Sequence, residues 1–93
     1  MNKPAHFKFR LYVAGDGPNS LQAVANLKTL CSDYLPGRHD VEVVDLLRDP
    51  QRALTDGVML TPLLVKLSPA PIQKITGSLG PREVLVQALG LST

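Results

Sequence analysis

Hydrophobic and polar residues alternate near the start of the chain, between positions 6 and 13. Side chains of an extended strand alternate between its two faces, so the apolar residues of this run share one face. They are Phe7, Phe9, Leu11 and Val13. The other face carries His6, Lys8, Arg10 and Tyr12. Since unpaired Lys and Arg are rarely buried, the pattern predicts a strand with one core face and one face that is at least partly wet.

A helical period replaces the alternation after the Gly/Pro-rich turn at 14–20. Apolar residues then recur every three or four positions, as on the buried side of a helix. They are Ala23, Val24, Leu27, Leu30, Cys31 and Tyr34. Two starts are open: Asn19 with Gln22 as a capping box, or Gly17 as the cap with Pro18 in the first turn. The segment 35–37, Leu-Pro-Gly, ends the helix.

A second strand is predicted over 40–47, and a strand, crossover helix and strand of this length form a right-handed unit with parallel strands. Asp49 followed by Pro50 predicts the start of a short helix over 50–56, with Asp49 as the cap and Gly57 as the stop. Asp45, on the second strand, has no obvious partner in the sequence. The unit predicts a layered α/β domain.

The second half of the chain specifies its structure less firmly. A third strand is predicted over 60–67, although the apolar run 63–67 also suits a buried helix. A turn over 68–71 leads to a fourth strand over 72–77, antiparallel to the third. A last helix begins near Gly80, with Val84, Leu85, Ala88, Leu89 and Leu91 as its apolar positions. The order β-α-β-α-β-β-α is the thioredoxin-like α/β topology, in a single domain over 1–93.

Composition narrows the range of possible functions. The 93 residues carry a net charge of +2, with two Phe, two Tyr and no Lys/Arg run, which argues against nucleic-acid binding. No apolar stretch approaches the ~20 residues of a membrane span, and residues 1–6 lack a signal-peptide core. The lone cysteine suits a reducing compartment. We therefore expect a cytoplasmic protein that binds neither nucleic acid nor membranes.

The predicted fold is that of a redox protein, but the reactive Cys-x-x-Cys of such a protein is missing. A thiol oxidoreductase needs a thiolate at the helix N-terminus, whereas Cys31 lies more than two turns into the helix. Ser20 has no histidine close in sequence, so capping explains it better than nucleophilic attack. The two histidines, His6 and His39, lack metal-like spacing. The segment 15–17 lacks the third glycine of a dinucleotide loop. We predict no catalytic residue, metal or cofactor.

Basic residues offer one candidate docking surface. Lys8 and Arg10 share a strand face, and Lys66 and Lys74 are candidates to lie near them. Such a patch attracts acidic partners, although scattered surface charge is more often simply solvated.

A set of motifs spread over the chain resembles the KaiB family of circadian clock proteins. The matching segments are 11–15 (Leu-Tyr-Val-Ala-Gly), 18–20 (Pro-Asn-Ser), 44–47 (Val-Asp-Leu-Leu), 49–51 (Asp-Pro-Gln), 60–62 (Leu-Thr-Pro) and 69–71 (Pro-Ala-Pro), with Ile75, Gly77, Arg82 and Glu83. The resemblance implies a non-enzymatic regulator that binds a KaiC-type hexameric ATPase and alters its ATPase and phosphorylation cycle. Partner-binding residues are then expected among Lys8, Arg10, Glu42, Lys66 and Lys74.

The resemblance also implies fold switching. Members of the family convert between a tetramer of β-α-β-β-α-α-β order and a thioredoxin-like monomer, refolding the residues after about 50. The residues expected to influence the switch are Thr61, Pro62, Pro69, Pro71, Ala88 and Gly90. Thr61–Pro62 stands where thioredoxin-like domains carry a cis-proline. Self-association as a dimer or tetramer belongs to the same expectation.

Departures from the family pattern refine these expectations. Leu54-Thr55 replaces an acidic pair, Glu42 and Gly57 replace lysines, and 88–90 is Ala-Leu-Gly instead of Gly-Leu-Asp. With no acidic tail after Thr93, these changes put binding to the third clock protein, KaiA, in doubt. Ala88 favours the last helix by up to ~1 kcal/mol over glycine, so we predict a lean toward the thioredoxin-like form.

Two other functions are weighed against this one. The first is a thioredoxin-like enzyme, which the missing Cys-x-x-Cys argues against. The second is a thioredoxin-like sensor or interaction module without redox activity, like the domain that precedes some histidine kinases. The sequence carries no kinase domain, so we expect that the protein is not a sensor module of this kind.

Overall fold

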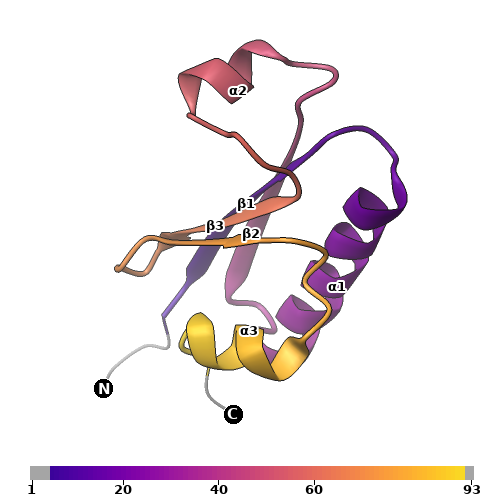
Figure 1. The fold of residues 1–93 in the computed structure, drawn as a ribbon. Helices are drawn as coiled ribbons and strands as arrows, with labels where there is room; N and C mark the ends of the chain where they lie inside the picture. The colour runs from indigo at the N-terminus through magenta and orange to yellow at the C-terminus, as the bar shows by residue number, and fades with distance from the viewer. Residues whose placement is uncertain (1–4, 92–93) are drawn as a thin grey trace.

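The computed structural model describes residues 5–91, and its elements follow the order predicted from the sequence (Figure 1). The strands are β1 (Phe7–Val13), β2 (His39–Asp45), β3 (Leu63–Ser68) and β4 (Gln73–Thr76). The helices are α1 (Pro18–Tyr34), α2 (Gln51–Thr55) and α3 (Arg82–Ala88). The apolar run 63–67, whose sequence suits either a strand or a buried helix, forms a strand in the structure.

The four strands form one mixed sheet in the order β2-β1-β3-β4. The neighbours β1 and β2 are parallel, as a crossover through α1 requires. Strand β3 runs antiparallel to β1, with an irregular register between Lys8 and Phe9, and β4 runs antiparallel to β3. This is the thioredoxin-like topology expected from the order of elements.

The two faces of the sheet carry apolar clusters of different size. Helices α1 and α3 cover one face, and α2 stands apart from them at one end of the sheet (Figure 1). The larger cluster joins the apolar face of β1 to Leu27 and Cys31 of α1, to Leu85 of α3 and to Leu89 just after α3. The smaller one, on the other face, consists of Tyr12, Val44, Leu63 and Val65. We call this second face the open face, because neither α1 nor α3 covers it.

Tyr12 is the buried part of a face that was predicted to be at least partly wet. The open face is wet at Lys8 and partly so at Arg10, but Tyr12 is only 3% exposed. Its ring packs in the smaller cluster while its hydroxyl reaches a carboxylate, so the residue satisfies both its apolar and its polar parts.

The structure decides between the two possible starts of α1, whereas the start of α2 and the end of β2 differ from expectation. Gly17 caps α1 and Pro18 begins it, so the Asn19–Gln22 capping box does not form. Helix α2 has Pro50 at its cap position without a side-chain hydrogen bond, so Asp49 is not the cap. Strand β2 ends at Asp45, because the Asp45 carboxylate accepts a hydrogen bond from the Leu47 backbone and turns the chain.

The last helix buries a narrower face than predicted. Leu85 and Leu89 are buried, but Val84 is 64% exposed and Val86 packs against the core instead. Leu85 and Leu89 are four positions apart and share the side that faces the core, whereas Val84 lies outside that side. Across residues 5–91, no helix combines the length and the apolar character that crossing a membrane requires.

Candidate functional site

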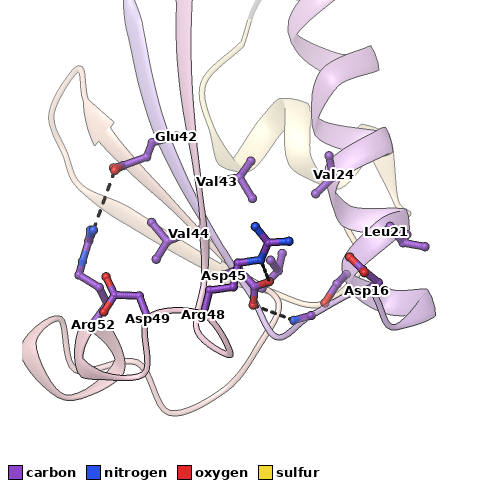
Figure 2. A pocket seen from close by; sticks show the side chains of 13 residues that line it. Asp16, Leu21, Val24, Glu42, Val43, Val44, Asp45, Arg48, Asp49 and Arg52 are labelled. Carbon is purple, nitrogen blue, oxygen red and sulfur yellow. Dashed lines mark hydrogen bonds and ion pairs between the residues drawn. The ribbon is translucent and has the colours of Figure 1, made fainter.

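An open pocket of about 480 Å³ lies where β1 and β2 end and α1 begins (Figure 2). This is the position at which thioredoxin-like domains carry their reactive turn. Charged side chains surround it, and Leu21, Val24 and Val43 supply its apolar wall. The charged residues are Asp16, Glu42, Asp45, Arg48, Asp49 and Arg52.

Asp45 organises this end of the sheet. Its Oδ1 accepts hydrogen bonds of 2.9 Å from the backbone N–H groups of Gly15 and Leu47. These bonds, first that from Gly15, lower the pKa of Asp45, and Arg48 adds an ion pair at 3.7 Å. The carboxylate therefore ties the turn after β1 to the end of β2, which explains a residue that had no partner in the sequence. Gly15 accommodates the contact with φ of +71°.

The pocket holds no activated nucleophile. Ser20 is buried, and its Oγ accepts a hydrogen bond from the Ala14 N–H at 3.4 Å. Cys31 is fully buried on α1, and burial raises the pKa of its thiol to about 11. Within residues 5–91 no three His, Cys, Asp or Glu side chains gather as a metal site would require.

Four of the five residues expected to bind a partner share the open face. Arg10 pairs across the sheet with Glu42 on one side and with Val65 on the other, and Lys74 lies opposite Val65 on β4. The Arg10 Nε donates to Glu42 Oε1 at 2.6 Å, and Lys8 and Lys74 are exposed. The face thus presents two exposed lysines beside the Arg10–Glu42 ion pair.

Lys66 does not join this patch, so the expectation for it was wrong. It lies opposite Phe9 in the register and therefore points to the α1/α3 face. The residue is only 4% exposed, with its Nζ 5.8 Å from the centre of the Phe7 ring. Residues 63–65 are apolar on both faces of β3, so their pattern gave no indication of the side on which Lys66 would lie.

A polar network on the open face was not anticipated. The Tyr12 hydroxyl donates to Asp56 Oδ2 at 2.6 Å, and Arg52 Nε donates to the same oxygen at 3.1 Å. The bond from Tyr12, and then that from Arg52, lower the pKa of Asp56. Arg52 also approaches Glu42 at 4.0 Å, a contact visible in Figure 2. Tyr12 and Asp56 are 44 positions apart, so no local motif signals that α2 is anchored here.

Comparison with known proteins decides the family. The family model described as the KaiB domain matches residues 10–91. The chain belongs to the KaiB family. The KaiB of Rippkaea orientalis, a circadian clock oscillator protein, is 40% identical over 85 residues, which are 91% of this chain and 82% of that protein. KaiB proteins are non-enzymatic, in agreement with the expectation that the chain is not an enzyme.

Solved structures support the same fold. The N-terminal domain of Synechococcus elongatus SasA superposes with a TM-score of 0.71 at 21% identity, covering 97% of this chain and 89% of that domain. Chloroplastic thioredoxin z gives a TM-score of 0.72 at 15% identity, covering 91% and 80%. At these identities the likeness concerns the fold alone, and it is a thioredoxin-like fold.

The residues that the KaiB resemblance links to switching lie at two ends of β3. Thr61 and Pro62 immediately precede it, with the bond between them cis. The others gather at its far end, in the wall of a second pocket between the β3–β4 turn and α3. They are Pro69, Pro71, Ala88 and Gly90. The bonds Ser68–Pro69 and Ala70–Pro71 are also cis.

Proposed function

We propose that this KaiB-family protein binds a KaiC-type hexameric ATPase and modulates its ATPase and phosphorylation cycle, in a circadian, timing or stress system. The observation that carries the proposal is the thioredoxin-like order of the sheet, β2-β1-β3-β4, in a member of the KaiB family. This is the arrangement that the family resemblance links to docking on KaiC.

The proposed docking surface is the open face together with α2. Lys8 and Lys74 supply exposed charge, and Arg10 and Glu42 form the ion pair between β1 and β2. On and after α2, three large apolar side chains are mostly exposed: Leu54 at 78%, Met59 at 93% and Leu60 at 67%. Interfaces combine an apolar centre with a polar rim, and this region of the molecule offers both.

Size-exclusion chromatography with a KaiC-type hexamer and ATP tests the proposal. We expect co-elution in at least one phosphorylation state and a changed rate of ATP hydrolysis. The double variant Lys8→Glu/Lys74→Glu should weaken binding at least tenfold, which corresponds to ~1.4 kcal/mol. Lys28→Glu is the matched control, because Lys28 is an exposed lysine on α1. Absence of binding in both phosphorylation states would remove the proposal.

We further propose that the residues after about 50 also adopt the β-α-β-β-α-α-β packing, in a self-associated state. The limited burial of α2 supports the idea, because none of its five residues is buried. Two packings that differ by a few kcal/mol interconvert and respond to partners. The residues named above at the two ends of β3 are the proposed switch positions, and the wild type is expected to favour the thioredoxin-like form.

Ala88→Gly tests this second proposal. Ala88 lies in α3, and glycine lowers helix stability by ~1 kcal/mol, so the minor packing should gain about fivefold in population. Ala25→Gly is the control, since α1 precedes the residues that repack. Amide NMR spectra and sedimentation over a range of concentrations report the two states. A single set of signals from a monomer, unchanged in Ala88→Gly, would contradict the proposal.

A further inference from the structure

A methionine that is almost fully exposed lies in the segment between α2 and β3. Met59 is 93% exposed, although methionine is among the residues most often buried in folded proteins. The chain is fixed on both sides of it. Val58 packs against the smaller apolar cluster and its N–H donates to the Ala53 carbonyl at 2.9 Å, and Leu63 is buried at the start of β3. The fold itself therefore holds this thioether in the solvent.

The exposed thioether belongs to the apolar part of the proposed docking surface. Leu54 on α2 and Leu60 next to Met59 are also mostly exposed. A partner that covers such side chains removes their surface from water, which favours association. Methionine suits this use, because its unbranched, polarisable side chain adapts to the surface of a partner. A chemical change at Met59 would therefore act on docking.

Methionine undergoes one reaction that leucine does not. A hydroperoxide transfers its terminal oxygen to the thioether sulfur, so that an S–O bond forms and the O–O bond breaks. The sulfur loses two electrons, and the peroxide takes them up and leaves as an alcohol, or as water where it is hydrogen peroxide. The reaction needs access to the sulfur, which Met59 offers and the fully buried thiol of Cys31 does not. Met1, the other methionine of the sequence, lies outside the described residues.

We propose that Met59 is a site of reversible oxidation by hydroperoxides, and that its sulfoxide weakens docking of the ATPase. The inference rests on the proposed function, which supplies the partner. The sulfoxide oxygen is a polar acceptor that loses its hydrogen bonds to water when the surface is covered, so a group that favoured association now opposes it. Two thiols reverse the change through a methionine sulfoxide reductase, forming a disulfide and water. Docking then responds to the level of peroxide.

Peptide mapping of the full chain tests the site. Hydrogen peroxide is added, catalase stops the reaction, and the digested chain is analysed by mass spectrometry. Met59 should gain one oxygen at a rate within about threefold of that of N-acetylmethionine amide in free solution, because its side chain is exposed. Oxidation of Met59 more than about tenfold slower than that of this reference compound would overturn the assignment.

Binding of the oxidised chain tests the consequence. Freed of peroxide, the oxidised chain should bind a KaiC-type hexamer about tenfold more weakly than the untreated chain, and methionine sulfoxide reductases A and B with dithiothreitol should restore binding. Met59→Leu keeps an apolar side chain of similar size and should bind within about twofold of wild type before and after peroxide treatment. Met59→Gln places a polar amide at this position and should bind about tenfold more weakly without any peroxide.

The outcomes separate this inference from the proposed function. An untreated chain that does not bind would remove the proposed function, and this inference with it. Binding that is equal before and after oxidation would overturn the inference alone. Met59→Leu retains Met1, so a loss of binding on peroxide treatment that persists in this variant would also overturn the inference, since the effect would then lie outside Met59.

Discussion

Replacing Gly15 by alanine should destabilise the protein through the backbone of a single turn. Gly15 has φ of +71°, and an alanine in this left-handed region costs roughly 1–2 kcal/mol. A Cβ built there would lie 2.7 Å from the Leu47 Cδ1. Leu47 is 70% exposed, so its side chain can move aside and adds little to the cost. We expect the free energy of unfolding to fall by about 1–2 kcal/mol.

Gly17 supplies the matched control in the same turn. It has φ of −62°, and an added Cβ would meet no atom within 4 Å. Alanine gains ~0.4–1 kcal/mol by restricting the unfolded chain, and it loses a similar amount as a poorer helix cap than glycine. Gly17→Ala should therefore stay within ~0.5 kcal/mol of wild type.

Urea unfolding followed by circular dichroism measures both variants, provided that the m-value stays constant. Gly15→Asn adds a third comparison, since asparagine tolerates the left-handed region better than alanine and should recover part of the loss. Equal destabilisation by Gly15→Ala and Gly17→Ala, or a neutral Gly15→Ala, would refute the reasoning from φ.

Three further predictions concern the core and the titrating groups. Leu64→Ala, at a site that is 1% exposed, should cost ~2.5–4 kcal/mol in urea unfolding, whereas Val84→Ala, at 64% exposure, should stay within ~0.5 kcal/mol. The pKa values of Asp45 and Asp56 are lowered in the folded state, so their stabilisation is present above the unfolded pKa of ~3.9 and disappears as the pH falls through the folded values. Urea midpoints between pH 6 and pH 2.5 should show this loss, and Asp45→Asn should flatten the acid limb; an unchanged limb contradicts the assignment. Cys31, with a pKa of about 11, should stay unreactive toward a disulfide reagent at pH 8 until urea unfolds the chain, and rapid native labelling would contradict its burial.

Local patterns predicted the fold well, because period and face are short-range properties. The alternation of β1 and the helical stripe around Leu27 and Cys31 both indicate a core face, and both are buried as expected. The parallel pairing of β1 with β2 followed from the length of the crossover alone. The run 63–67 was decided only by the tertiary structure, in which it pairs with both β1 and β4.

The candidate sites were less predictable, because they depend on register and on distant partners. Lys66 was a candidate to lie near Lys8 and Arg10. The strand register instead places it opposite Phe9, on the other face of the sheet. Asp45 was singled out without an explanation, and its partner is a backbone N–H thirty positions away. The link between Tyr12 and Asp56 has no local signature, since capping and turn chemistry are the only motifs that the sequence shows near α2.

The attachment of α2 determines where the chain is open to proteolysis. This helix buries no residue of its own and is held to the sheet largely by contacts to charged groups, Tyr12–Asp56 and Arg52–Glu42 above all. Such contacts are screened by salt, whereas the apolar cluster beneath α1 and α3 is not. Opening of α2 therefore requires only a small part of the global unfolding free energy. A protease should cut first between Leu47 and Leu60, faster at high ionic strength, while the rest of the sheet stays intact.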